Sequence, residues 1–211
     1  MTPVHPAQPL PKDRGPSGED GQAPPGAVPG PPLPQLGDPW TARVARPDGA
    51  DLDVVHDWMQ ARHIDAFWHQ AWSRERWAEE ISGHLAGDAV LPVLIDLDGT
   101  PFAYIEVYRI LRDRLAQEYP YRSRDLGLHI AIGEVGRTGR GLGRALLRAL
   151  AEGLLAADPR CTRVVAEPDV TNEPSLRAFA AAGFRHAGQV VFPDKTSALV
   201  IRPRGEEDMP R

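Results

Sequence analysis

Residues 139–156 read Gly-Arg-Gly-Leu-Gly-Arg-Ala-Leu-Leu-Arg-Ala-Leu-Ala-Glu-Gly-Leu-Leu-Ala. Leucine and alanine recur at helical spacing from Leu142 to Leu154, which predicts an amphipathic helix over 142–156 directly after a glycine loop. An apolar segment that contains His129 precedes the loop, and a second one, Arg163 to Glu167, follows the helix. The stretch therefore predicts a strand, a tight loop, a helix and a second strand.

The glycine loop has the features of an anion site. The first four N–H groups of a helix have no partner within the helix, and the helix dipole places partial positive charge there. Gly141 and Gly143 let a pyrophosphate approach the main chain, and Arg137, Arg140 and Arg144 add positive charge. The loop lacks the third spaced glycine of dinucleotide folds and the Gly-Lys-Ser/Thr of a P-loop, so neither nucleotide fold is expected.

Two apolar runs earlier in the chain, Leu91 to Leu97 and Phe102 to Tyr108, predict a β-hairpin. Asp98-Gly99, which joins them, is a dipeptide typical of tight hairpin turns. The other elements that we expect are a strand over Thr41 to Ala45, helices that begin near Asp51 and at Ser73, a polar helix-like stretch from Arg112 to Tyr119, a helix over 173–182 and two closing strands.

The glycine loop and the segment from Asn172 to Phe184 resemble the GNAT family of acyl-coenzyme A N-acyltransferases. Thr138 stands where the family's pyrophosphate loop has Gln or Arg, whereas both loop glycines match. The resemblance covers roughly residues 41 to 202 and implies an α/β GNAT fold, a single domain with a central mixed, mostly antiparallel sheet flanked by helices. It also implies acyl-coenzyme A as co-substrate, with contacts from Ile130, Ala131, Arg137, Gly139, Arg140, Gly141, Leu142, Gly143, Arg144, Asn172 and Phe179.

An aromatic passage from His63 to Trp72 resembles the siderophore branch of this family, the acyltransferases of aerobactin and mycobactin assembly. All five tryptophans lie between residues 40 and 77, and the similarity continues through Tyr104 to Tyr108 and Asp125 to His129. The resemblance implies a lysine- or diamine-derived amine or hydroxylamine acceptor. Judged from its residues alone, without the resemblance, the passage is equally well explained as an aromatic packing corner. The expected acceptor contacts are His63, Trp68, Trp72, Glu106, Tyr108 and Tyr121.

His129 is the predicted catalytic base. With an ordinary pKa near 6.5, a histidine can take a proton from the attacking amine at neutral pH. By resemblance, Asp169 orients the acceptor or stabilises protonated His129, although Asp169 also suits the start of the helix near Asn172. The family's tyrosine acid is replaced by Phe179. The expected chemistry is direct attack on the thioester, with no nucleophilic role for Cys161.

Composition limits the alternatives. A chain of 211 residues with 42% hydrophobic content suits one domain, and a net charge of −5 argues against nucleic-acid binding. With one cysteine, and with His63 and His69 lacking a third ligand, we expect no metal site. No apolar run suits a membrane span and no leader is apparent, so a cytoplasmic protein is expected.

The first 39 residues hold 12 of the 22 prolines, which predicts a disordered Pro/Gly-rich tail over 1–38, an acyltransferase domain over 39–203 and a flexible C-terminus over 204–211. An acyl carrier protein or siderophore assembly enzymes are possible partners, and the protein is expected to be a monomer or dimer.

Two other functions are compatible with the same motifs. One is an aminoglycoside 6′-N-acetyltransferase, disfavoured because Arg109, Arg112, Arg114, Arg122 and Arg124 suggest a basic acceptor region. The other is a non-catalytic acyl-coenzyme A-binding scaffold, disfavoured because His129 and Asp169 are both present.

Overall fold

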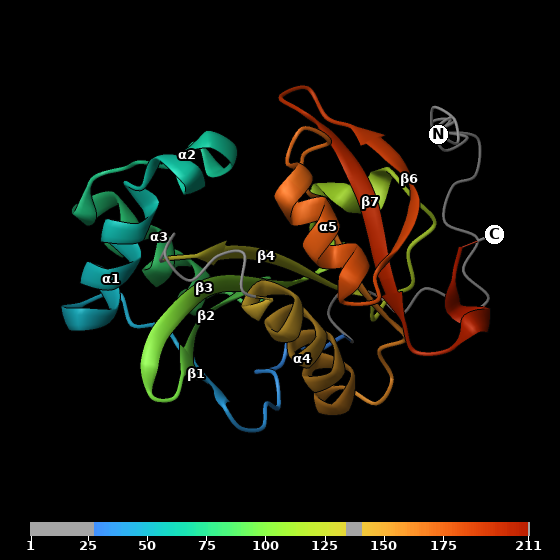
Figure 1. The fold of residues 1–211 in the computed structure, drawn as a ribbon, viewed down its shortest axis with the longest axis horizontal. Coiled ribbons are helices and arrows are strands. Elements are labelled where there is room, and N and C mark those ends of the chain that lie inside the picture. The colour runs from blue at the N-terminus through green and yellow to red at the C-terminus, as the bar shows by residue number, and fades with distance from the viewer. Residues whose placement is uncertain (1–27, 134–140, 211) are drawn as a thin grey trace.

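The computed structural model describes residues 28–133 and 141–210. These residues form one seven-stranded sheet in the order β1-β2-β3-β4-β5-β7-β6, flanked by helices (Figure 1). The strands and α-helices are β1 (Trp40–Val44), α1 (Gly49–Met59), α2 (Arg62–Trp68), α3 (Arg74–Ala86), β2 (Val90–Leu97), β3 (Thr100–Arg109), β4 (Leu126–Ile132), α4 (Leu142–Ala157), β5 (Arg163–Ala166), α5 (Glu173–Ala181), β6 (Arg185–Val191) and β7 (Thr196–Pro203). Short 3₁₀ turns are η2 (Ile110–Arg112), η3 (Arg114–Gln117) and η5 (Glu206–Asp208).

The β2–β3 hairpin is confirmed, because Asp98 and Gly99 both have positive φ and the strands pair around them. The expected helix-like stretch after Arg112 is a pair of 3₁₀ turns instead, and α2 is a helix that the aromatic passage did not predict. Every strand pairing is antiparallel except β4 with β5, so the mixed, mostly antiparallel sheet is confirmed.

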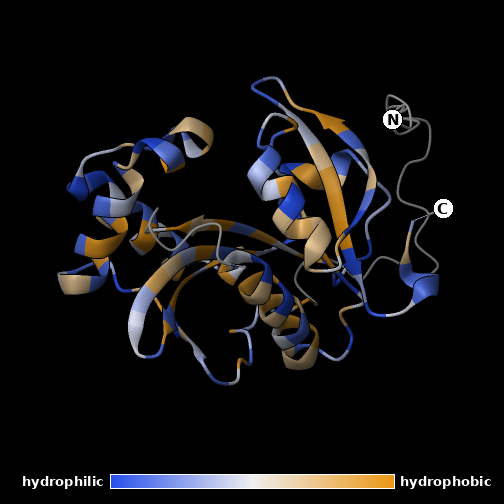
Figure 2. Ribbon diagram, viewed as in Figure 1, coloured by the Kyte–Doolittle hydropathy of each residue, from blue (hydrophilic) through white to orange (hydrophobic). Residues whose placement is uncertain are grey.

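Both faces of the sheet are covered. The α4 helix buries Leu146, Leu150 and Leu154 against Ile105 and the other residues of that face. The α1 and α3 helices cover the opposite face, where Tyr104 packs among their tryptophans and aliphatic side chains. Each fully buried leucine contributes about 1.5–3 kcal/mol. Figure 2 shows β4 and part of β7 in the hydrophobic colour and α4 alternating along its length.

The N-terminal boundary differs from the expected one. Val28 is buried, and the backbone N–H of Gln35 bonds the carbonyl of Gly153 in α4. Arg109 donates to the carbonyls of Pro29 and Gly30, and its guanidinium lies 2.7 Å from Asp158. Residues 28–38 therefore pack on the domain without secondary structure, because arginine side chains bond the carbonyl groups of a proline-rich segment. Residues 1–27 lie outside the described part.

The C-terminal residues also pack on the domain. Arg204 donates to the carbonyls of Leu155 and Cys161, and the side chain of Asp208 is paired with Arg122. The expected flexible terminus from residue 204 is thus held through η5 in the structure.

Candidate active site

Three ionisable side chains lie in a row across three neighbouring strands. Glu106 is the register partner of His129 in the antiparallel β3–β4 pair. The parallel β4–β5 pair is short: Leu126 faces Val164 and Gly127 faces Val165, and beyond them the strands part. Glu167 follows the end of β5, on the other side of this separation. The sheet thus places a carboxylate on each side of His129.

Both nitrogens of the His129 ring face carboxylates. Nδ1 lies 3.3 Å from Oε2 of Glu106, and Nε2 lies 3.2 Å from Oε1 of Glu167. Both carboxylates are largely buried, with side-chain exposures of 12% and 5%, whereas the His129 side chain is 37% exposed. A ring with both nitrogens donating is an imidazolium, so the geometry favours the protonated form.

The pKa of His129 follows from two opposed effects. Burial lowers the pKa, but hydrogen bonds and charge from Glu106 and Glu167 outweigh it and raise the pKa to about 9. Burial raises the pKa of each glutamate, yet their bonds to His129 and the other cations bring both down to about 2. The sequence expectation of an ordinary pKa near 6.5 is therefore wrong: in the free protein the row holds two carboxylates and an imidazolium at neutral pH.

Each glutamate has further partners away from His129. Oε2 of Glu167 lies 2.6 Å from Nζ of Lys195 and accepts a hydrogen bond from Ser197. Glu106 accepts a bond from the Tyr104 hydroxyl and lies 3.5 Å from Nε2 of His84. Burial lowers the pKa of His84 and Glu106 raises it, with a net rise. The row therefore continues from Glu106 to His84 on α3 and from Glu167 to Lys195 in the loop before β7.

Aromatic side chains surround the His129 ring. Tyr108 faces Gly127 in the ladder and its ring centre lies 4.8 Å from that of His129. Only glycine fits at position 127, because a Cβ atom there would come within 2.2 Å of the Tyr108 ring. Trp68 meets the His129 ring edge-on at 6.1 Å. Within the described part of the chain, the buried Tyr108 hydroxyl has no hydrogen-bond partner.

The row opens into a cavity of about 480 Å³ between α2, β4 and α5. Its lining includes five carboxylates and the cations Arg114 and Lys195 beside His129; the carboxylates are Glu106, Asp113, Glu167, Asp169 and Asp194. The cavity is therefore acidic, and the sequence expectation of a basic acceptor region is wrong.

The arginines behind that expectation have other positions. Arg109 and Arg124 bind Asp158, Arg122 binds Asp208, and Arg112 binds the carbonyls of Val28 and Asp88. Only Arg114, of the five, lines the cavity. Four of them thus hold chain segments together and do not set the charge around His129.

The N-terminus of α4 is the predicted anion site. Gly141 has φ of 79°, a conformation that suits glycine, and no side chain of the described residues caps the helix. The first-turn N–H groups of a helix have no partner within the helix, so a terminus of this kind suits an anion. Leu142, Gly143 and Arg144 lie in this first turn, whereas Arg137, Gly139 and Arg140 lie outside the described residues.

Of the other expected cofactor contacts, three line the cavity: Ile130, Asn172 and Phe179. Asn172 also caps α5 by accepting a bond from the Ser175 N–H. Ala131 is buried against the α1–α3 side instead. Beyond Gly127, the edge of β4 that faces β5 has no partner strand among the described residues, which leaves main-chain groups available to a ligand.

Of the six expected acceptor contacts, Trp68 and Glu106 line the cavity, Tyr108 packs against His129 without lining it, and three lie elsewhere. His63 donates from Nε2 to the carbonyl of Ile132 and so holds α2 against the end of β4. Trp72 packs on Trp77, and the guanidinium of Arg76 lies over its ring. This is the aromatic packing corner that the sequence offered as the alternative to an acceptor contact. Tyr121 packs beside the apolar cluster around Tyr119. These three side chains therefore hold or fill the space between elements and do not line the cavity.

Asp169 lines the cavity but is not bonded to His129. Its carboxylate accepts from the backbone N–H and the hydroxyl of Thr171, a local turn, and its backbone forms a bridge with Ser197. The stabilising role expected of Asp169 falls to Glu167, two residues earlier. Sequence reasoning missed Glu167 and Lys195. The signal for Glu167 is register: it lies two residues beyond Val165, as His129 lies two beyond Gly127.

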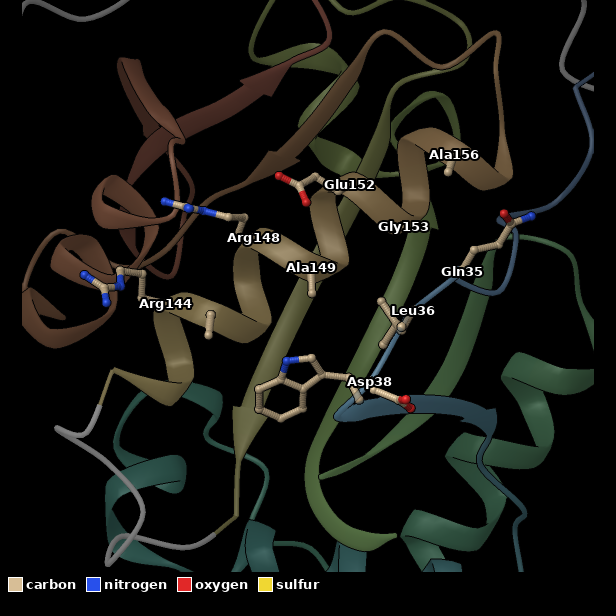
Figure 3. A pocket seen from close by; sticks show the side chains of 12 residues that line it. Gln35, Leu36, Asp38, Arg144, Arg148, Ala149, Glu152, Gly153 and Ala156 are labelled. Carbon is tan, nitrogen blue, oxygen red and sulfur yellow. The ribbon is translucent and has the colours of Figure 1, made fainter. Parts of the chain in front are cut away.

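A larger hollow, of about 720 Å³, lies on the outside of α4 (Figure 3). Gln35, Leu36 and Asp38 form one wall, and Arg144, Arg148 and Glu152 project from the helix on the other. Glu152 is paired with Arg202 and Arg148 donates to the carbonyl of Ala181. None of the row of residues around His129 reaches this hollow, so the smaller cavity is the candidate active site.

The family model of the acetyltransferase (GNAT) domain matches residues 48–192. The chain belongs to the GNAT family. As a GNAT protein it is an acyl-coenzyme A-dependent N-acyltransferase, which agrees with the names of its relatives. None of the helices described in the structure combines the length and apolar character needed to cross a membrane.

The similar proteins include acyltransferases named for lysine or hydroxylysine and acetyltransferases named for aminoglycosides. The lysine N-acyltransferase MbtK of Mycolicibacterium paratuberculosis is 36% identical over 172 residues, which is 82% of this chain and 77% of that protein. The N(6)-hydroxylysine O-acetyltransferase of Escherichia coli is 30% identical, covering 77% of this chain but 51% of its own length. Among solved structures, AAC(6′)-Ib in complex with ribostamycin and coenzyme A has a TM-score of 0.72 at 27% identity, covering 79% of this chain and 94% of that one.

Proposed function

We propose that this protein transfers an acyl group from acyl-coenzyme A to the amine or hydroxylamine of a small lysine- or diamine-derived siderophore precursor, with His129 as the general base. The observation that carries the proposal is the row Glu106–His129–Glu167 at the place where β4 and β5 part. An acid–base group there faces both the acidic cavity and the free strand edge.

The chain offers distinct groups for the two halves of acyl-coenzyme A. The first-turn N–H groups of α4, with Arg144 nearby, suit the diphosphate. The unpaired edge of β4 suits the amide groups of the pantetheine arm, and Asn172 and Phe179 lie on the facing wall. The thioester would then arrive beside His129, between the two strands.

The acidic lining suits a cationic acceptor. Glu106 and Glu167 stay ionised at neutral pH, since the pKa of each is lowered to about 2. They and the carboxylates at the mouth attract an ammonium group into the cavity. The names of the relatives, lysine N-acyltransferase and N(6)-hydroxylysine O-acetyltransferase, agree with an acceptor of this kind.

In the reaction, the acceptor nitrogen attacks the thioester carbonyl, a C–N bond forms and the C–S bond breaks. The nitrogen, as the free amine or hydroxylamine, loses a proton to His129, and coenzyme A leaves as the thiolate. A base with a pKa of about 9 is neutral in only a few per cent of molecules at pH 7.5. The rate should therefore rise with pH until that pKa is passed.

A second candidate is aminoglycoside 6′-N-acetylation. The observation in its favour is again the acidic cavity, which suits a polycation as well as it suits lysine, together with the resemblance to AAC(6′)-Ib. The first candidate is preferred because the lysine N-acyltransferase shares more of the sequence, 36% against 29% for the aminoglycoside N(6′)-acetyltransferase of Klebsiella pneumoniae.

The test is a thiol-release assay with acetyl-, succinyl- and long-chain acyl-coenzyme A against lysine, N6-hydroxylysine, hydroxycadaverine and kanamycin. Turnover confined to the lysine or hydroxylamine acceptors supports the proposal, and turnover on kanamycin alone assigns the second function. Coenzyme A binding without turnover on any acceptor would contradict both. The same donors loaded on an acyl carrier protein test whether a carrier replaces coenzyme A.

A further inference from the structure

Lys195 closes the row of charges on the side of the cavity. It belongs to the turn between β6 and β7, where its carbonyl accepts the backbone N–H of Phe192. Its Nζ lies 2.6 Å from Oε2 of Glu167, and the side chain is 25% exposed. Lys195 therefore reaches from a surface turn to the carboxylate that holds His129.

The two oxygens of Glu167 have separate partners. Oε1 faces His129, while Oε2 takes both Lys195 and the Ser197 hydroxyl. This division fixes the plane of the carboxylate, since turning it out of that plane would break the contacts to His129 and to Lys195 together. Ser197 is fully buried and neutral, so Lys195 is the partner that balances the negative charge.

We propose that Lys195 is a positioning residue that orients Glu167 and, by sharing its charge, sets how tightly the carboxylate holds the proton of His129. The inference rests on the proposed role of His129 as base. With Lys195 in place, Glu167 divides its attraction between two cations, and His129 gives up its proton more readily than it would to an unshared carboxylate.

The other charged groups near the row are accounted for by different contacts. On the far side, Glu106 is shared by His129 and His84, and receives the Tyr104 hydroxyl. At the mouth, Arg114 forms a bidentate pair with Asp194. Asp113 accepts from the Leu115 N–H and Asp169 from Thr171, and the buried Tyr108 stays neutral because burial raises its pKa. Among the described residues, Lys195 is thus the cation besides His129 that pairs with Glu167.

The experiment is an NMR titration of the His129 ring in the free, full-length protein, which requires no substrate. The wild type should titrate near 9. Lys195→Met removes the cation, so the midpoint of His129 should rise by about one unit, with about a tenfold smaller neutral fraction at pH 7.5. Lys195→Arg, which keeps the charge, should restore the wild-type midpoint.

Two variants control the experiment. Arg185→Met removes an exposed cation at the opposite end of β6, paired with Glu206, and should leave the midpoint unchanged. Lys195→Gln keeps a hydrogen-bond donor without charge and should behave as Lys195→Met does; it also replaces that variant if the methionine protein does not fold. An unchanged His129 midpoint in folded Lys195→Met or Lys195→Gln protein would overturn the inference.

Kinetics give the second readout. The midpoint of the kcat/KM profile should move upward with the NMR midpoint in Lys195→Met, while the KM for acyl-coenzyme A stays near the wild-type value. Because the titration is measured without acceptor, it decides the role of Lys195 even if the acceptor panel assigns a different substrate. A loss of activity with no shift in either midpoint would leave Lys195 a structural residue and contradict the inference.

Discussion

Nε2 of His129 and Oε1 of Glu167 lie 3.2 Å apart across the point where β4 and β5 separate. Burial lowers the pKa of His129, but this bond and its counterpart to Glu106 raise it to about 9. The pair therefore joins two strands that no longer share backbone hydrogen bonds, and it fixes the protonation of the proposed base.

Replacing Glu167 by glutamine should lower the pKa of His129. One of the two carboxylates that stabilise the imidazolium is lost, so the kcat/KM midpoint should move down by one to three pH units. The pH profile of Glu167→Gln, measured against wild type, checks this. Glu173→Gln, at an exposed helix pair with Arg177, is the matched control and should not shift the midpoint. A Glu167→Gln profile that overlays the wild type would show that the carboxylate does not act on His129.

Substituting Gly141 by alanine should weaken acyl-coenzyme A binding. The φ of 79° at this residue is strained by about 1–2 kcal/mol for a residue with a Cβ, so the first turn of α4 should shift. We expect about a tenfold rise in the KM for acyl-coenzyme A. Gly83→Ala in α3, where a Cβ meets no atom within 4 Å, is the control and should leave that KM unchanged. Equal KM values in both variants would argue against the helix terminus as the diphosphate site.

Arg109→Met should destabilise the fold and release the N-terminal segment. The substitution leaves Asp158 buried with less compensation and removes the donor to Pro29 and Gly30, at a cost of about 3–5 kcal/mol in the free energy of unfolding. Urea unfolding measures the loss, and limited proteolysis should show faster cleavage before Gln35. Arg74→Met, which breaks an exposed pair with Asp53, should cost less than about 1 kcal/mol. Similar losses in the two variants would contradict the anchoring role.

Much of the fold follows from local sequence. Asp98 and Gly99 both have a positive φ, which few other residue types adopt readily. The spacing of apolar residues in α4 gives that helix one apolar face, which packs against the sheet. Residues 28–38 could not be predicted as packed, because prolines do not form regular elements and their carbonyls are bound by arginines about 80 residues away.

The site shows the same limit. His129 follows from its strand and motif, whereas Glu167 is recognised only when the register of β4 against β5 is known. Asp169 also carries a carboxylate and lies two residues later, but that carboxylate accepts hydrogen bonds from Thr171. The arginines of residues 109–124 read as a basic patch in the sequence, yet four of them pair inside the fold. Charge in a sequence does not reveal which charges are already paired.

Cys161 should not react with thiol reagents in the folded protein. It is fully buried, and burial raises the pKa of its thiol to about 12, so the nucleophilic thiolate is absent at neutral pH. A thiol reagent applied at pH 8 should label Cys161 only after unfolding, and Cys161→Ala should retain kcat. An acyl adduct on Cys161 during turnover, seen by mass spectrometry, would contradict direct transfer.

The most direct test of the central claim is the pH dependence of kcat/KM with a hydroxylamine acceptor, compared between wild type and His129→Ala. A hydroxylamine nitrogen is far less basic than an alkylamine, so the acceptor does not titrate in the range where His129 does. In wild type, kcat/KM should rise about tenfold per pH unit and level off near 9, and the variant should lose about 10²–10⁴-fold in rate together with the inflection. A folded His129→Ala protein that keeps the wild-type rate and profile would contradict the assignment of His129 as the base.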